Sequence, residues 1–248
     1  MAFVAGASRG IGRAIAGALA DQGALVAVAA RTEREGESKA PGTIHSVVAT
    51  IRARGGSALP VRCDVTDEAS VNAAVQATVD ATGHIDILVA NAGVMWLAPT
   101  LDTPLKRWEL CLRVNLTGVF LVTRAVLPHV LAQQSGSLIA LTTTGVHTTE
   151  LGTNAYWVSK AGVERYYIGL ATELAPHNIA VNCLAPAKVV LTEGWEVGGG
   201  HPLPQEMIEP ETAIAKAAVW LAGQDAAGIT GTVQYSLDLL GELSMSLD

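Results

Sequence analysis

Short runs of apolar residues recur along the chain and alternate with longer segments in which apolar residues return every three or four positions. The short runs are rich in Ala, Val, Leu and Ile, a composition typical of parallel strands that are buried on both faces. This pattern predicts seven strands, at Ala2–Ala5, Leu25–Ala30, Ala58–Arg62, Ile85–Ala90, Ser137–Leu141, Ile179–Leu184 and Thr232–Ser236.

The segments between the strands have helical periodicity. Apolar residues recur at helical spacing in Thr43–Arg54, and the segment after Asp67 begins with a negatively charged cap. Strands that alternate with helices predict an α/β fold, a doubly wound parallel sheet with right-handed crossovers and helices on both faces. No linker divides the chain, so we expect a single domain over residues 1–248. We expect a polar loop at Arg31–Gly42 and a small substrate-loop insertion near residues 191–208.

Composition narrows the function classes. Half of the 248 residues are hydrophobic, which allows a sizeable core, and the formal net charge of −7 argues against nucleic acid as a partner. The cysteines Cys63, Cys111 and Cys183 are scattered through apolar segments, so we expect reduced thiols and no metal site. We see no secretory signal and no run of about 18 apolar residues, and therefore expect a cytoplasmic protein without a membrane partner.

A glycine-rich turn follows the first predicted strand and leads into the predicted helix Arg13–Ala20. It reads Gly6-Ala7-Ser8-Arg9-Gly10-Ile11-Gly12, with the spacing GxxxGxG. Glycines at such a turn let the backbone approach a pyrophosphate, and a helix N-terminus offers free N–H groups and a favourable dipole. A glycine-rich turn alone can be only a tight turn, but its position between a strand and a helix favours a dinucleotide site.

With this spacing the chain resembles the short-chain dehydrogenase/reductase family, and four further motifs follow in the family's order. Cys63-Asp64-Val65 is similar to its adenine contact, and Ala90-Asn91-Ala92-Gly93 to its NNAG strand end, with Ala in place of the first Asn. Asn115 is similar to its catalytic asparagine, and Tyr156 with Lys160 to its YxxxK pair. The resemblance implies a Rossmann-fold domain that transfers a hydride between a nicotinamide cofactor and a carbonyl or alcohol. The implied cofactor contacts are Gly6, Ser8, Arg9, Gly10, Ile11, Gly12, Arg31, Asp64, Val65, Asn91, Ala92, Gly93, Tyr156, Lys160, Pro186 and Val189; the implied catalytic residues are Asn115, Thr143, Tyr156 and Lys160.

The end of the second strand indicates which cofactor binds. An acid at this point binds the ribose 2′-hydroxyl of NAD in many Rossmann folds, but here the position is Ala30, followed by Arg31. An arginine can pair with a 2′-phosphate through two hydrogen bonds, and Arg9 in the glycine turn is a second cation for the same region. Although each arginine alone is more often a solvated charge, the two together favour NADP(H).

The chemistry requires an acid that gives a proton to the carbonyl oxygen. Free tyrosine is a weak acid, and Lys160, one helical turn after Tyr156, is expected to lower the pKa of the phenol by its positive charge. Thr143 occupies the position, thirteen residues before the tyrosine, where the family places a serine. A threonine can donate the same hydrogen bond, but its methyl restricts χ1 and crowds the pocket. The alternative is a decayed site in which the threonines only continue a strand.

The C-terminal part departs from the family pattern. The family has Pro-Gly and a threonine five residues after the proline, whereas here Ala187 follows Pro186 and the threonine is Thr192. Ser236-Leu237-Asp238 also replaces the usual Asp-Gly-Gly. With these shifts, and with Leu101–Arg107 and Gly42–Ile44, the chain resembles a hydroxysteroid-dehydrogenase-like subgroup. The name of this subgroup carries little information about the substrate, so we do not infer a steroid from it.

The substrate pocket is expected outside the carboxyl ends of the strands. Its expected lid is Leu191–Met207, with Gly198-Gly199-Gly200. The residues of the lid and of the pocket walls could instead belong to ordinary packing or a disordered loop. For His147, one of the expected walls, the two interpretations are equally weighted. An apolar pocket would favour a hydrophobic ketone or aldehyde. The expected walls are Met95, Trp96, His147, Leu151 and Trp195.

Three functions remain open from the sequence. The leading one is an NADP(H)-dependent carbonyl reductase or alcohol dehydrogenase. The second is a non-catalytic NADP-binding sensor or interaction protein on the same fold, and the third is an enzyme that reduces a C=C bond. The resemblance also implies a homodimer or homotetramer built on the long helices near Pro104–Leu131 and Asn154–Ala175.

Overall fold

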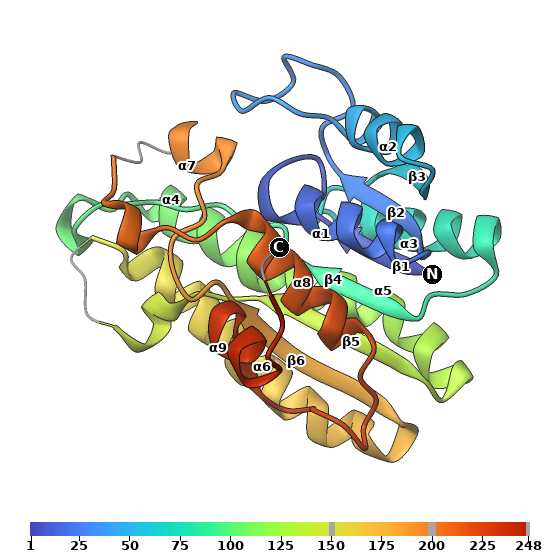
Figure 1. The fold of residues 1–248 in the computed structure, drawn as a ribbon. Coiled ribbons are helices and arrows are strands. Elements are labelled where there is room, and N and C mark those ends of the chain that lie inside the picture. The colour runs from blue at the N-terminus through green and yellow to red at the C-terminus, as the bar shows by residue number, and fades with distance from the viewer. Residues whose placement is uncertain (149–151, 198–201, 247–248) are drawn as a thin grey trace.

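All seven predicted strands form, and they pair in one parallel sheet with the order β3-β2-β1-β4-β5-β6-β7. The computed structural model describes residues 1–148, 152–197 and 202–246 (Figure 1). Strand β4 begins two residues later than predicted, and the other ends differ by one residue at most. The strands are β1 (Ala2–Ala5), β2 (Leu25–Ala30), β3 (Ser57–Arg62), β4 (Ile87–Ala90), β5 (Gly136–Leu141), β6 (Ile179–Ala185) and β7 (Val233–Tyr235).

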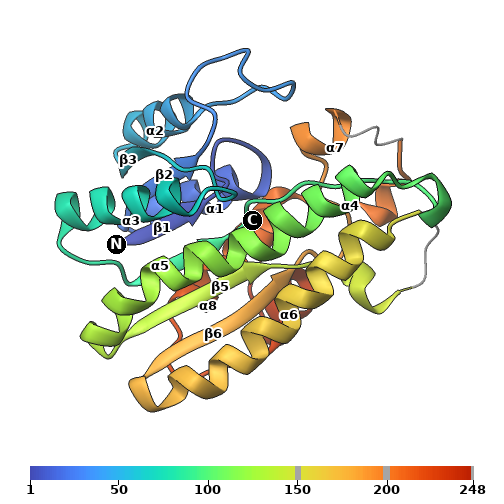
Figure 2. The same cartoon turned by 180° about the vertical axis from the view of Figure 1, so that it is seen from behind.

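Helices cover both faces of this sheet (Figures 1 and 2). The α-helices are α1 (Gly10–Asp21), α2 (Ile44–Ala53), α3 (Glu68–Thr82), α4 (Leu105–Cys111), α5 (Gly118–Gln133), α6 (Asn154–Leu174), α7 (Glu193–Val197), α8 (Glu211–Ala222) and α9 (Ser236–Glu242). Shorter helical turns are η1 (Thr100–Asp102), η2 (Leu112–Thr117), η3 (Thr144–His147), η4 (Ala175–His177) and η5 (Gln205–Met207).

Two hydrophobic clusters lie on opposite faces of the sheet, because successive strand side chains point to opposite sides. Val4 of β1 belongs to the cluster under α1, α2, α8 and α9. Its neighbour Phe3 belongs to the cluster under α3, α5 and α6. Aliphatic residues dominate both clusters, as the low aromatic content of 4% requires. The doubly wound fold predicted from the sequence is confirmed.

The helix predicted over Pro104–Leu131 is continuous from Leu105 to Gln133, but its second segment, η2, is a π-helix. By length and composition it could also cross a membrane, with a mean hydropathy of 1.6 over its most apolar window. In the structure Val122 and Val126 of α5 are buried in the sheet core. One face of this segment therefore packs as a core helix does.

The order of the sheet locates the candidate site. The chain leaves β1 toward β2 on one side, whereas β4 lies on the other side of β1. Ligands of doubly wound folds bind at such a switch point, outside the carboxyl ends of the strands. The glycine turn follows β1, and Asn91-Ala92-Gly93 follows β4, so both lie at this edge.

Candidate functional site

The glycine turn and the end of β4 pack so closely that two glycines have no room for a side chain. Gly6 has φ +77°, and a Cβ there would lie 2.6 Å from Ala92 Cα. A Cβ on Gly12 would lie 2.4 Å from both Asn91 Nδ2 and Gly6 O. Asn91 Nδ2 donates to Gly6 O at 2.9 Å and ties the two strand ends together. This exposed backbone at the start of α1 fits a pyrophosphate, as the sequence predicts.

A carboxylate of the chain itself lies at this turn. Glu193, the first residue of α7, accepts a hydrogen bond from Gly10 N at 3.0 Å and pairs with Arg13 of α1. Burial raises the pKa of Glu193, but backbone hydrogen bonds and the charge of Arg13 outweigh burial and lower it. Glu193 is thus ionised at neutral pH and stands where the sequence places a phosphate.

Arg9 and Arg31 lie near the end of β2. Arg9 donates to Thr32 Oγ1 at 3.1 Å, to Gly42 O at 3.0 Å and to Pro41 O at 2.9 Å, so it is anchored to the loop that follows β2. Arg31 is exposed, and its charge acts on Arg9. Ala30 is 7% exposed and ends the strand without an acid.

Asp64 and Val65 follow β3 at the same edge. Asp64 Oδ1 accepts from Thr66 N at 3.0 Å and from Thr66 Oγ1 at 2.7 Å. Burial raises the pKa of Asp64, yet the Thr66 hydrogen bonds and the charges of Arg31 and Arg62 lower it overall. Val65 packs against Gly118, where a Cβ would lie 2.9 Å from Val65 Cγ2.

Asn115 lies inside the π-helix η2 and is fully buried. Its side chain accepts from Val94 N at 2.8 Å and donates to Val94 O at 2.9 Å and to Ser159 Oγ at 2.9 Å. The side chain therefore joins the segment after β4 to α6. Single π-helical turns are frequent at functional sites.

Lys160 meets this cluster from α6. A Cβ on Gly93 would lie 3.5 Å from Asn115 Oδ1 and 3.7 Å from Lys160 Nζ. Lys160 Nζ also donates to Leu141 O at 2.7 Å, at the end of β5. Burial lowers the pKa of Lys160 to about 8, although Cys183 and Glu164 act in the opposite direction.

The pKa of the Tyr156 phenol differs from the sequence prediction. Lys160 Nζ lies 5.8 Å from the centre of the Tyr156 ring, so the predicted pair shares one face of α6. Burial, with a smaller effect of Cys111, raises the pKa of Tyr156 to about 12, although the residue as a whole is partly exposed. The pKa of Tyr156 is thus raised in this structure, where the sequence predicts a lowered one; burial is the main cause, and the Lys160 ammonium donates to the Leu141 carbonyl.

Thr143 caps the short helix η3. Its Oγ1 accepts from Gly145 N at 3.3 Å, and the residue is partly exposed. The neighbouring Thr142 donates to Glu164 at 2.6 Å, and His147 lies 3.1 Å from the other oxygen of the same carboxylate. Thr143 thus lies two residues after the strand end that Lys160 contacts.

The segment after β6 is held by a buried carboxylate. Glu209 accepts from Lys188 N at 3.0 Å and from Ser236 Oγ at 2.6 Å. Val189 N donates to Met207 O at 2.9 Å, and Val189 O accepts from Glu209 N at 3.0 Å. Both polar backbone groups of Val189, which the sequence assigns to the cofactor, therefore have partners in the chain. Pro186 is partly buried directly after the end of β6.

The expected pocket walls have different surroundings. Trp96 lies under Arg107 of α4, with the guanidinium carbon 4.5 Å from the ring centre, and its buried Nε1 has no hydrogen-bond partner among the described residues. Met95 and Trp195 are partly buried. Two further expectations, Leu151 and the lid glycines Gly198–Gly200, lie outside the described residues.

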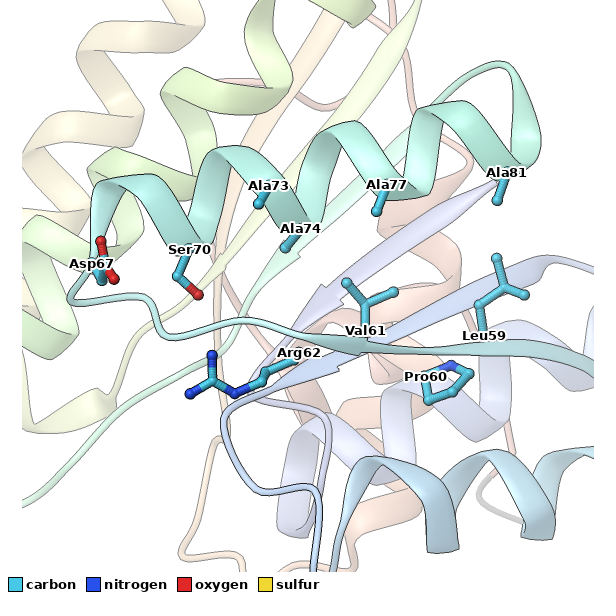
Figure 3. Close-up of a pocket in the computed structure, with 10 residues that line it drawn as sticks. All are labelled: Leu59, Pro60, Val61, Arg62, Asp67, Ser70, Ala73, Ala74, Ala77 and Ala81. Atoms are coloured by element: carbon cyan, nitrogen blue, oxygen red, sulfur yellow. The ribbon is translucent and has the colours of Figure 1, made fainter.

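A groove of about 510 Å³ lies elsewhere, between β3 and α3 (Figure 3). Leu59 and Val61 of β3 face Ala73, Ala77 and Ala81 of α3 across it. No lining residue belongs to the predicted catalytic set. We therefore locate the candidate chemistry at the strand ends and not in this groove.

Sequence reasoning missed three polar residues at the site, namely Ser159, Glu164 and Glu193. Ser159 and Glu164 had a signal, because they follow Tyr156 and Lys160 in the same helix. Glu193 had none, since only the fold brings it to Gly10, which lies 183 positions away in the chain.

Comparisons with known proteins agree with this geometry. The family model described as short chain dehydrogenase matches residues 1–197. The zebrafish (Danio rerio) protein named hydroxysteroid dehydrogenase-like protein 2 is 36% identical over 236 residues, which cover 90% of this chain and 55% of that protein. Its human counterpart is 37% identical over 206 residues, which cover 80% of this chain and 47% of that protein. The chain thus spans about half the length of these relatives.

Solved structures are similar over almost the whole chain. A crystal structure from Xanthomonas campestris, provisionally assigned as a dehydrogenase, has a TM-score of 0.88 and 37% identity and covers 98% of this chain and 89% of its own. A short-chain type dehydrogenase/reductase from Mycobacterium marinum has a TM-score of 0.82 and 32% identity, with coverage of 94% and 92%. The chain therefore belongs to the short-chain dehydrogenase/reductase family of nicotinamide-dependent oxidoreductases and is similar to its hydroxysteroid-dehydrogenase-like members.

Proposed function

We propose that the protein is an NADP(H)-dependent oxidoreductase that reduces a hydrophobic ketone or aldehyde, or oxidises the corresponding secondary alcohol. The observation that carries the proposal is that the cofactor-binding and acid–base residues come together at Gly93. There the strand end beside the glycine turn lies against Asn115 and Lys160, one helical turn from Tyr156. A nucleotide site and an acid–base group thus share one edge of the sheet.

Each side chain has a role that its contacts support. When bound, the nicotinamide supplies the hydride. Tyr156, whose pKa of about 12 keeps it protonated at neutral pH, gives its proton to the carbonyl oxygen. Thr143 Oγ1 accepts from Gly145 N, which leaves its own proton for the substrate oxygen.

Lys160 and Asn115 act behind the phenol. Lys160, with a pKa near 8, is protonated over most of the physiological range and favours negative charge on Tyr156 as the proton leaves. Asn115 fixes the segment after β4 against α6. We expect it also to anchor a water relay behind the lysine.

The preference for NADP(H) rests on Arg9 and Arg31. A 2′-phosphate at the end of β2 would meet Arg31, which is exposed, and Arg9, which the loop holds in place. No carboxylate stands at Ala30 to repel it. The relevant experiment is a titration with both reduced cofactors, in which NADPH should bind more tightly than NADH.

A non-catalytic NADP-binding sensor is the second candidate. Thr143 in place of serine, the partnered backbone of Val189 and the carboxylate of Glu193 at the glycine turn favour it. A third candidate uses the same residues on a C=C bond. NADPH oxidation measured against a panel of ketones, aldehydes and enones separates the three, because the sensor turns over none of them.

We further propose a homodimer or homotetramer that uses the outer face of α4, α5 and α6. Leu105 is 70% exposed, Val158 is 47% exposed, and Phe120 is 42% exposed beside Tyr166. Apolar side chains gathered on adjacent helices are typical of subunit contacts. We propose no nucleic-acid or membrane partner and a cytoplasmic location, where the free thiols Cys63, Cys111 and Cys183 would stay reduced.

A further inference from the structure

A buried carboxylate that the proposed mechanism does not use lies next to the catalytic residues. Glu164 is on α6, one helical turn after Lys160 and two turns after Tyr156, and is 5% exposed. Removing a carboxylate from water is costly unless charges or hydrogen bonds compensate. Its partners should therefore show what retains it there.

The two oxygens of Glu164 contact the chain on either side of Thr143. Oε1 accepts from Thr142 Oγ1 at 2.6 Å, in the residue just before Thr143. Oε2 lies 3.1 Å from Nε2 of His147, the last residue of the short helix that Thr143 caps. One side chain thus fixes both flanks of the residue that is proposed to hold the substrate oxygen.

The charge of Glu164 also acts on Lys160. The ammonium is buried and donates to Leu141 O, the residue before Thr142. Burial lowers its pKa to about 8, while the charges of Cys183 and Glu164 raise it. Besides His147, Glu164 also acts on Cys183 of β6 and Tyr235 of β7, and burial raises the pKa of both, that of Cys183 to about 12.

The neighbours of Glu164 differ in their exposure to solvent. His147 is on the solvent side, with its side chain 57% exposed, and Lys160 is on the inner side. The carboxylate therefore contacts an exposed imidazole and lies one helical turn from a buried lysine. A neutral residue could fill the same space, but one of the influences that raise the pKa of Lys160 against burial would be lost.

We propose that Glu164 is a positioning residue for catalysis, which aligns Thr143 through hydrogen bonds to its two flanks and places a carboxylate one helical turn from Lys160. The inference rests on the proposed function of the site. It adds a second layer to the tyrosine–lysine pair, because one side chain holds the flanks of the substrate-oxygen donor and also acts on the lysine.

Two near-isosteric variants separate these contributions. Glu164→Gln removes the charge and keeps groups that can hydrogen-bond to Thr142 and His147. Thr142→Val keeps the charge and removes the hydrogen bond to one flank of Thr143. Glu173→Gln is the matched control, because it makes the same charge change at an exposed position of the same helix.

The first readout is the pH profile of NADPH-dependent reduction, which needs Lys160 protonated. Loss of the Glu164 charge lowers the pKa of Lys160 further, so Glu164→Gln should lose activity at lower pH than the wild type and the Glu173→Gln control. Thr142→Val should lower kcat about tenfold with little change in the dissociation constant of NADPH, and its pH profile should keep its position. A wild-type kcat in Thr142→Val would overturn the alignment, and an unshifted profile in Glu164→Gln would overturn the charge effect.

A second readout does not depend on turnover. The chain has five lysines, so the Lys160 signal can be identified with a Lys160→Met variant in a ¹³C NMR titration of the lysine side chains. The pKa of Lys160 should be lower in Glu164→Gln than in the wild type and in Glu173→Gln. If no substrate turns over, the proposed function fails, whereas an unchanged Lys160 pKa overturns the role of Glu164 by itself.

Discussion

We expect the carboxylate of Glu193 to compete with a bound phosphate for the glycine turn. It accepts from Gly10 N and pairs with Arg13, and its lowered pKa keeps it charged at neutral pH. A pyrophosphate that uses the same N–H groups must displace it. Glu193→Gln should therefore tighten nucleotide binding, because it removes the competing charge and frees Arg13 for the phosphate.

The size of this effect follows from the two contacts. A hydrogen bond to a charged group contributes about 1.5–3 kcal/mol and an exposed ion pair about 0–1 kcal/mol. Both side chains here are partly solvated, at 39% for Arg13 and 22% for Glu193, so together we take roughly 1–2 kcal/mol. A tenfold change in affinity corresponds to about 1.4 kcal/mol, and glutamine keeps part of the hydrogen bond, so the dissociation constant should fall roughly three- to tenfold.

Titration of NADPH fluorescence against wild type and variant measures this directly. Glu211→Gln is the matched control, because Glu211 also pairs with Arg13, at 3.3 Å, but has no hydrogen bond to Gly10. The control should bind NADPH within about twofold of the wild type. A dissociation constant in Glu193→Gln that is equal to or weaker than that of the wild type, in a variant of unchanged thermal stability, would refute the competition.

The remaining predictions concern cofactor choice, the substrate-oxygen donor and assembly. Arg31→Asp should weaken NADPH binding by roughly 10- to 100-fold and leave NADH binding little changed, whereas Arg34→Asp in the same loop should not; equal dissociation constants for the two cofactors in the wild type would contradict this. Thr143→Ala should lower kcat, and Thr143→Ser should match or exceed the wild type because it keeps the hydroxyl without the methyl; an active alanine variant would exclude the hydroxyl as donor. Light scattering at micromolar concentration should show a dimer or tetramer that Phe120→Asp dissociates, and a monomeric wild type would rule out the proposed interface.

Much of the fold could be predicted because parallel strands buried on both faces leave a clear signal. The runs at Ala2–Ala5 and Leu25–Ala30 became strands with those bounds. The short η2 segment could not be predicted, because one π-helical turn changes no hydrophobic period. Only the structure shows that this turn carries Asn115 between Val94 and Ser159.

The motif residues could be identified one by one, but their electrostatics could not. The i, i+4 spacing places Lys160 beside Tyr156, yet the pKa of the phenol depends on its burial and on the direction of the ammonium, which binds Leu141 O. Contacts between distant segments, such as Gly10 with Glu193, are set by the tertiary fold and leave no local pattern in the sequence.

The central claim is that Tyr156 gives the proton during NADPH-dependent carbonyl reduction. The most direct measurement is the rate of NADPH oxidation by wild type and Tyr156→Phe on the best substrate of a ketone and aldehyde panel, together with NADPH binding by both proteins. Loss of a general acid costs a factor of about 10² to 10⁴ in rate, and the phenol does not hold the phosphates, so turnover should collapse while the dissociation constant of NADPH stays nearly the same. Full activity of Tyr156→Phe on a substrate that the wild type reduces would show that the proton comes from another group and would contradict the account.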